Sequence, residues 1–180
     1  MLNKFETAGD RRTVVYSPPE SERLFRDEIA QAWGLAPQAD GDLGNRMRDF
    51  FESNAEANVK NILIGSDTPN LPVSVVDTVA GWLGECDVVL GPSADGGYYL
   101  IAMTNPVSGL FEDIQWSTEE VLASTIAKLD AAGCSYKLLP EMKDVDEFSD
   151  LELLMTNLRA ADEAEDKPLL EELLQLEMQL

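Results

Sequence analysis

The sequence predicts an α/β fold with a mostly parallel sheet. Short apolar runs typical of buried strands alternate with amphipathic segments of about 12 to 16 residues, which are typical of helices. The chain has 180 residues, of which 44% are apolar, enough for one domain with a sizeable core. We therefore expect a single domain over residues 1–180, with helices covering the sheet.

The first part of the chain begins this alternation. Thr13–Tyr16 is a short β-rich run, and Ser17 to Glu20 has the S-x-x-E form of a capping box, with prolines where a first helical turn tolerates them. This pattern predicts a helix over residues 20–33. The next predicted elements are a strand over residues 35–38 and a helix over residues 42–57, with Leu43, Met47, Phe50 and Phe51 facing inward.

The second part continues it with longer apolar runs. Asn61–Gly65 is almost continuously apolar, which suits a strand buried on both faces of a parallel sheet. A second capping box, Ser117 to Glu120, predicts a helix that Gly133 ends. The other predicted elements are strands over residues 87–91, 98–103 and 134–139, a helix over 72–83, and helical regions from about Glu147 and Pro168.

Charge and residue types exclude several classes of function. The chain has 34 acidic and 13 basic residues, a net charge of −21, which repels nucleic acids and anionic membranes, so we expect neither as a partner. Without histidine, a Ser-His-Asp triad or a histidine-ligated metal is impossible. Cys86 and Cys134 fit reduced core residues of a cytoplasmic protein. Carboxylates, with a metal held by them, must therefore carry any chemistry.

The acidic charge is densest at the end of the chain. Residues 141–180 hold 13 acidic and 3 basic residues. We expect an acidic helical extension over about residues 147–180, packed on the domain with a solvated face; an acidic helix that binds a partner is the alternative.

Four aspartates follow predicted strands. Asp67 comes after the strand at 61–65, Asp95 after the strand at 87–91, and Asp144 and Asp146 after the strand at 134–139. Ligands bind beyond the carboxyl ends of strands in such sheets, and oxygen ligands suit Mg²⁺ or Mn²⁺ bound together with phosphates. Each aspartate could instead be a turn or helix-cap residue, and Asp95-Gly96-Gly97 could be a hairpin turn. Their shared position after strands of one sheet favours a functional interpretation.

The segment Gln38–Met47 is a second candidate. Gly41 and Gly44 lie where a helix opens, and its first N–H groups could meet an anion, with Arg46 as a cation for a phosphate. A simple strand–helix turn capped by Asp42 is equally compatible. Neither a Walker A sequence nor G-x-G-x-x-G is present.

These motifs together resemble a known group of proteins. ILIGSDTPNLP, DVVLGPSADGGYYLIAM, IQWSTEEVL, KDVDEFSDL and QADGDLGNRM resemble the selenodomain-associated transferase group of the GT-A nucleotide-diphospho-sugar transferase superfamily, over about residues 13–151. The resemblance implies a three-layer α/β/α, Rossmann-like GT-A fold. More distantly the chain is similar to molybdenum-cofactor guanylyltransferase and 2-phospho-lactate guanylyltransferase.

The resemblance also implies roles for individual residues. Asp67 would be the metal-binding aspartate, completed by Asp144 or Asp146 with Mg²⁺ or Mn²⁺, and Asp95 a catalytic base. The implied nucleotide- and substrate-binding residues are Gly41, Asp42, Leu43, Gly44, Arg46, Gly96, Gly97, Trp116, Ser117 and Thr118. A metal-dependent glycosyltransferase is the leading hypothesis, a nucleotidyltransferase is the alternative, and a non-catalytic interaction module is a third.

One part of the pattern is missing. The family begins with a strand and a loop carrying a P-G-x-x-K-T-R-like segment that wraps the diphosphate, whereas this sequence starts at a point matching the end of the family's first helix. We therefore expect an N-terminally truncated fold, an exposed sheet edge and weakened nucleotide binding. A misplaced coding start, a homodimer that covers the edge, and a non-catalytic relative are the open explanations.

Overall fold

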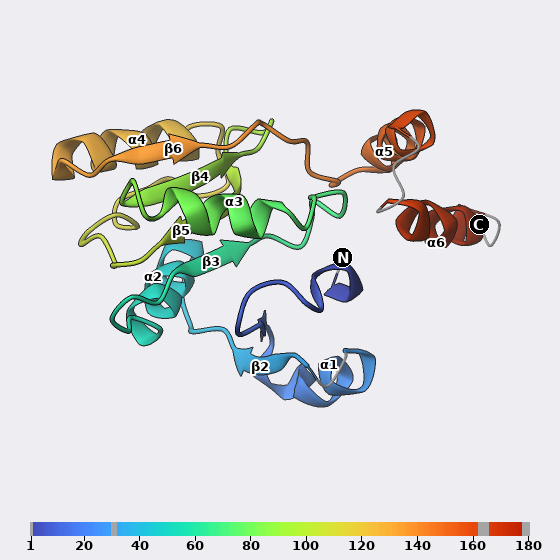
Figure 1. The fold of residues 1–180 in the computed structure, drawn as a ribbon, viewed down its shortest axis with the longest axis horizontal. Helices are drawn as coiled ribbons and strands as arrows, with labels where there is room; N and C mark the ends of the chain where they lie inside the picture. The colour runs from blue at the N-terminus through green and yellow to red at the C-terminus, as the bar shows by residue number, and fades with distance from the viewer. Residues whose placement is uncertain (1, 30–31, 162–165, 178–180) are drawn as a thin grey trace.

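A computed structural model describes residues 2–29, 32–161 and 166–177 (Figure 1). These residues form a mixed α/β structure with two sheets. The smaller sheet pairs β1 with β2, and the larger has the strand order β3-β5-β4-β6. The elements are η1 (Leu2–Phe5), β1 (Thr13–Tyr16), η2 (Pro19–Ser21), α1 (Glu22–Glu28), β2 (Gly34–Pro37), α2 (Leu43–Ser53), β3 (Asn61–Ile64), α3 (Val75–Trp82), β4 (Val88–Pro92), β5 (Tyr98–Met103), α4 (Val121–Ala132), β6 (Tyr136–Leu138), α5 (Phe148–Ala161) and α6 (Lys167–Glu177).

The larger sheet brings three carboxyl ends to one edge. β4 pairs in parallel with β6, and β5 runs antiparallel to both β3 and β4, so β3, β4 and β6 point the same way. The loops after these three strands therefore lie at one edge of the sheet, as the sequence predicted. The prediction of one continuous sheet differs from the structure, because β1 and β2 pair in parallel only with each other.

Helices cover both faces of the larger sheet. Alternate residues of β4 and β5 point to opposite sides, so Val89 and Ala102 join one apolar cluster while Leu90 and Ile101 join the other. The first cluster contains buried residues of α3, and the second contains buried residues of α2 and α4. This gives the three-layer α/β/α arrangement expected.

Several helix boundaries were predicted wrongly. Neither predicted capping box forms a side-chain cap: α1 begins at Glu22 after a cis Ser17–Pro18 peptide and a short 3-10 turn, and α4 begins at Val121. α1 ends at Glu28 because Ile29 adopts an extended backbone, so the expected helix over residues 20–33 is shorter. Leu43, expected to face inward, has 51% of its surface exposed.

The C-terminal helices α5 and α6 lie away from the larger sheet in Figure 1. They contact each other, and the ammonium of Lys4 in η1 lies 2.8 Å from the Asp166 carboxylate just before α6. Within the part of the chain that the structure describes, no helix is long and apolar enough to cross a membrane.

Candidate functional site

Asp67 lies in the loop that follows β3, and this loop is fixed to the segment after β6. The backbone N–H of Val145 donates to the carbonyl oxygen of Asp67 at 2.9 Å. The carboxylate of Asp67 lies against Gly65, where a Cβ atom would come within 2.8 Å of its Oδ1. The sheet edge thus holds Asp67 directly beside the residues that flank Val145, which are Asp144 and Asp146.

Asp95 lies in the tight turn between β4 and β5, which Gly96 N–H closes by donating to the carbonyl of Ser93 at 3.1 Å. Its Oδ1 accepts a hydrogen bond from Gly97 N–H at 2.8 Å, a turn typical of aspartate. Gly96 has φ = +89°, and a Cβ there would come within 2.2 Å of the carbonyl oxygen of Glu119. Its own carbonyl accepts from the N–H of Leu122 at 2.9 Å, which fixes the turn to the start of α4. Glycine is therefore required at this point by both conformation and space.

A second connection ties this turn to the segment after β6. Ser93 forms a parallel bridge with Met142, in which Met142 N–H donates to Pro92 at 3.0 Å and Ala94 N–H donates to Met142 at 2.9 Å. The segment that leads into Lys143 and Asp144 is therefore held beside the end of β4.

The four aspartates form one electrostatic group, which we call the carboxylate cluster: Asp67, Asp95, Asp144 and Asp146. The pKa of Asp146 is raised above its usual value, because ionised neighbours and partial desolvation disfavour its charge. The causes, in order, are the charge of Asp144, desolvation, and the charges of Asp67, Asp95 and Asp150.

Within the described residues, no three acidic or cysteine side chains stand close enough together to hold a metal ion by themselves. The donor atoms are nevertheless oxygens, the type that Mg²⁺ and Mn²⁺ accept, and these ions often need only one or two carboxylates beside substrate phosphates.

Arg46, the cation predicted to meet a phosphate, and Lys143, which directly precedes Asp144, both already have partners. Lys143 Nζ lies 2.7 Å from Asp150 Oδ1, and this hydrogen bond raises the pKa of Lys143. Arg46 donates from Nη1 to Gln38 Oε1 at 2.8 Å and from Nε to the carbonyl of Gly41 at 3.1 Å. These two hydrogen bonds of Arg46 stabilise the turn before α2, and the sequence analysis did not predict them.

The start of α2 approaches the loop before α4. Asp42 caps α2, accepting from the N–H of Asn45 at 2.8 Å, as the simpler interpretation of this segment predicted. Gly44 is buried, and a Cβ at Gly44 would come within 2.6 Å of Nε1 of Trp116 and 2.7 Å of the carbonyl oxygen of Phe111. Gly41–Gly44, predicted to bind the nucleotide, therefore lies directly beside Trp116–Thr118, which we call the W-S-T loop.

The remaining predicted site residues are exposed. Ser117 has φ = +62° and Thr118 donates its hydroxyl hydrogen to the carbonyl of Gln115 at 2.8 Å. Together with Leu43 they lie on the surface. Trp116 places this loop beside Gly44 of α2, and Glu119 places its end beside Gly96.

Two features of the site were not predicted. Asp150, in the first turn of α5, accepts hydrogen bonds from the ammonium of Lys143 and from the backbone N–H groups of Glu147 and Asp146, and these contacts lower its pKa. Thr68 is fully buried beside Asp67, and its Oγ1 has no hydrogen-bond partner in the described chain. An acidic residue three positions after the residue that precedes a helix often caps that helix, so the position of Asp150 after Glu147 could have predicted this cap. No local sequence pattern predicts that Thr68 is buried.

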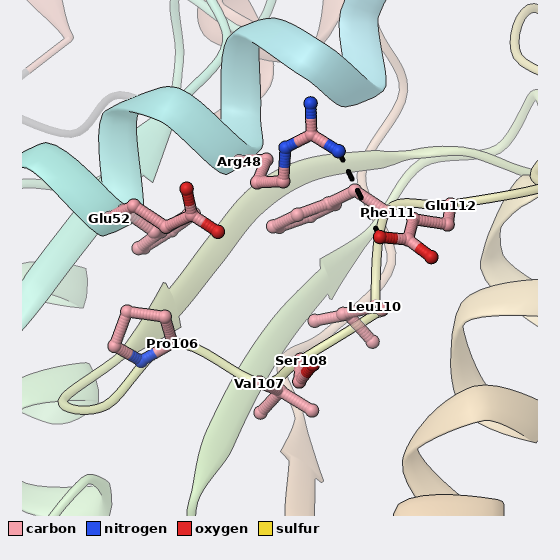
Figure 2. Close-up of a pocket in the computed structure, with 10 residues that line it drawn as sticks. Arg48, Glu52, Pro106, Val107, Ser108, Leu110, Phe111 and Glu112 are labelled. Carbon is pink, nitrogen blue, oxygen red and sulfur yellow. Dashed lines mark ion pairs between the residues drawn. The ribbon is translucent and has the colours of Figure 1, made fainter.

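A hollow of about 180 Å³ lies elsewhere (Figure 2). It lies between α2 and the loop after β5, and an ion pair at 3.9 Å joins Arg48 to Glu112 across it. Because β5 runs opposite to β3 and β4, this loop is at the other end of the sheet from the carboxylate cluster. Because Glu52 and Glu112 outnumber Arg48, the hollow has a net negative charge, which disfavours a phosphate.

Comparisons with known proteins show the fold and the family of this chain. The structure is similar to a solved structure, described as that of a candidate nucleotide-diphospho-sugar transferase, from Desulfovibrio desulfuricans G20, with a TM-score of 0.81 and 24% sequence identity. The match covers 92% of this chain and 73% of that chain, and it shows that the two share a fold. Residues 2–118 match the family of uncharacterised proteins conserved in bacteria called DUF2064, and the chain belongs to this family. A comparison with curated proteins finds no match.

Proposed function

We propose that this protein is a metal-dependent transferase that acts on a nucleotide-diphospho-sugar. The observation that carries the proposal is the carboxylate cluster at the carboxyl edge of β3, β4 and β6, in a protein that shares its fold with a candidate enzyme of that class. Ligands of open α/β sheets bind at this edge. The selenodomain-associated group is the subgroup whose motifs the sequence resembles.

The reaction would transfer a glycosyl group to an acceptor hydroxyl. The acceptor oxygen bonds to the anomeric carbon, the bond from that carbon to the diphosphate oxygen breaks, and the nucleoside diphosphate leaves with the bonding electrons. Asp95, exposed and held by Gly97 N–H, takes the acceptor proton as general base. The backbone of Gly96 and Gly97 would let the substrate approach closely.

The oxygen donors of the carboxylate cluster suit a divalent cation bound together with a diphosphate. Asp67 would hold Mg²⁺ or Mn²⁺ with Asp144 or Asp146, and the ion would supply charge that offsets the phosphates and the leaving group. The nucleoside would lie against Gly41–Gly44 and Trp116, with Ser117 and Thr118 as exposed hydroxyls beside it.

The negative charge of the carboxylate cluster makes the dependence of nucleotide binding on a cation testable. The carboxylate cluster repels a diphosphate, and Lys143 and Arg46 are held by Asp150 and Gln38. Nucleotide affinity should therefore depend on the cation. We expect a nucleotide sugar to raise the melting temperature only when Mn²⁺ is present, and Mn²⁺ alone to have a smaller effect.

The experiment is thermal unfolding with Mn²⁺ and a panel of UDP-, GDP- and TDP-sugars. Asp67→Asn should abolish the joint effect, and Asp49→Asn, an exposed position of α2, should leave it intact. A joint effect that survives Asp67→Asn, or no effect with any member of the panel, would refute the proposal.

A nucleotidyltransferase is the second candidate. Asp67 with Asp144 or Asp146 would hold a cation for nucleotidyl transfer in the same way, beside the phosphates of the substrate. Such an enzyme would bind a nucleoside triphosphate and release pyrophosphate. Metal-dependent exchange of labelled pyrophosphate into a triphosphate would favour it over glycosyl transfer.

A further inference from the structure

Asp144 and Asp146 lie on a segment without helix or strand, between the end of β6 and the start of α5. Figure 1 shows α5 set apart from the larger sheet, so this segment links the sheet edge to a helix outside the sheet layers. A side chain on such a segment keeps a fixed place where the backbone that carries it is anchored. One anchor is the hydrogen bond from Val145 N–H to the Asp67 carbonyl, at 2.9 Å.

Asp150 supplies a second anchor, on the other side of Val145. Its Oδ2 accepts hydrogen bonds from the backbone N–H groups of Asp146 at 3.3 Å and Glu147 at 3.0 Å. Its Oδ1 lies 2.7 Å from the ammonium of Lys143, and its side chain is 12% exposed. In a capping box, the acidic side chain reaches the N–H of the residue that precedes the helix, here Glu147. The contacts with Asp146 and Lys143 go beyond such a cap, because they hold the segment that leads into α5.

Electrostatic repulsion acts against this arrangement. The other three members of the carboxylate cluster all disfavour an ionised Asp146, so their charges push its segment away from the loops after β3 and β4. Hydrogen bonds from backbone N–H groups to a carboxylate are stronger than those to a neutral acceptor, and here they oppose that movement. Asp150 adds a negative charge of its own, which the ammonium of Lys143 offsets.

We propose that Asp150 is a positioning residue of the candidate cation site: its Oδ2 holds the backbone of Asp146, which keeps the carboxylates of Asp144 and Asp146 within reach of a cation bound by Asp67. This inference rests on the proposed metal-dependent function and adds to it a residue that acts through the ligands. Loss of Oδ2 as an acceptor should therefore weaken cation binding, although every oxygen donor of the carboxylate cluster is still present.

The test is a titration of the full chain with Mn²⁺ alone at pH 7, in which electron paramagnetic resonance measures the free ion. Asp150→Ala and Asp150→Asn both remove the charge that pairs with Lys143, but the carbonyl oxygen of asparagine can still accept the two N–H groups. The difference between them isolates the hydrogen bonds from the charge. We expect Asp150→Ala to weaken Mn²⁺ binding about tenfold, as is usual when a residue that orients metal ligands is lost, and Asp150→Asn to retain most of the affinity.

Leu158→Ala is the control for a general loss of stability in α5. Leu158 is 5% exposed in the same helix, so its truncation should lower the melting temperature and leave Mn²⁺ binding unchanged. Amide hydrogen exchange at Val145 gives a second measurement, made without metal. It should be about tenfold faster in Asp150→Ala than in Leu158→Ala, because the bond from Val145 to Asp67 loses its neighbouring anchor.

Three results would overturn the proposal: Mn²⁺ binding by Asp150→Ala equal to that of the parent, equal weakening in Asp150→Ala and Asp150→Asn, or equal weakening in Leu158→Ala. Asp67→Asn separates this inference from the proposed function. If Asp67→Asn abolishes Mn²⁺ binding and Asp150→Ala does not alter it, the cation site stands and the role of Asp150 falls. If the parent and Asp67→Asn bind Mn²⁺ equally, the proposed function falls and this inference with it.

Discussion

Val145 donates its backbone N–H to the carbonyl oxygen of Asp67 at 2.9 Å, which joins the loop after β3 to the segment after β6. This bond holds Asp144 and Asp146 beside Asp67, although 77 or more positions separate them in the sequence. The electrostatic repulsion within the carboxylate cluster is a direct consequence, and it can be measured.

Asp146→Asn should stabilise the protein at neutral pH. The pKa of Asp146 is raised in the folded state, chiefly by Asp144, so folding is helped by the protonated form and this help is lost as the pH rises from the ordinary value of 3.8 through the raised pKa. The variant should therefore melt at a higher temperature than the parent at pH 7 and at nearly the same temperature below pH 3.8. Thermal unfolding across this range measures the difference.

The control for this prediction is Asp49→Asn, which removes one exposed charge of α2 outside the cluster. Added salt should reduce the gain of Asp146→Asn, because salt screens exposed charges. A variant no more stable than its parent at pH 7 would show that the repulsion is negligible.

Gly96→Ala should destabilise the protein by about 2–4 kcal/mol, because it combines a left-handed backbone with a collision against another backbone segment. A Cβ at Gly96 would lie 2.2 Å from the carbonyl oxygen of Glu119, which cannot move without displacing the start of α4. Gly133→Ala is the control: its φ is +67° but no atom lies within 4 Å, so only the backbone cost of about 1 kcal/mol remains. Urea unfolding of both variants tests the difference, and equal losses would contradict the close contact.

Asp42→Ala should cost about 1 kcal/mol through the loss of the cap on α2. Its carboxylate accepts from Asn45 N–H at 2.8 Å, whereas Ser74, at the same position of α3, makes no side-chain cap. Ser74→Ala should consequently change the free energy of unfolding by less than about 0.5 kcal/mol. Chemical denaturation of the two variants compares the caps, and a cost at Ser74 as large as at Asp42 would contradict this assignment.

The order of the elements and the position of the aspartates were predictable because they depend on local patterns. NILI, VVLG and YYLIAM are apolar on successive residues, which suits strands buried on both faces, and all three form strands of the larger sheet. The carboxyl ends of parallel strands share an edge, so Asp67 and the segment holding Asp146 were expected together before their contacts were known.

Boundaries and pairing were less predictable because they depend on distant contacts. The S-x-x-E pattern at Ser117 fails as a cap because the turn at Gly96 fixes Leu122 N–H, and Ser117 itself adopts φ = +62°. The separation of β1 and β2 into their own sheet depends on strand pairing, which no local pattern of residues specifies. The reversed direction of β5 does have a local signal, because Asp95-Gly96-Gly97 was a candidate hairpin turn and β4 and β5 pair antiparallel across it. Likewise, Arg46 has the charge expected of a phosphate ligand, and only the structure reveals its bond to Gln38.

Gly44→Ala should destabilise the protein, although alanine is the better helix former. Gly44 lies in the first turn of α2, where a Cβ would come within 2.6 Å of Trp116 Nε1 and 2.7 Å of the Phe111 carbonyl oxygen. Overpacking of this kind costs about 1–3 kcal/mol and outweighs a helix-propensity gain of about 1 kcal/mol. Gly81→Ala in α3 has no atom within 4 Å of the new methyl group, so it should gain up to about 1 kcal/mol instead.

The measurement is urea unfolding of both variants, followed by far-UV circular dichroism, with the tryptophan emission spectrum recorded in parallel. Opposite signs for the two substitutions are expected, together with a spectral change for Gly44→Ala, because the indole of Trp116 must move to admit the methyl group. If Gly44→Ala were as stabilising as Gly81→Ala, α2 would not be packed against the W-S-T loop, and the candidate nucleoside segment would lie apart from it.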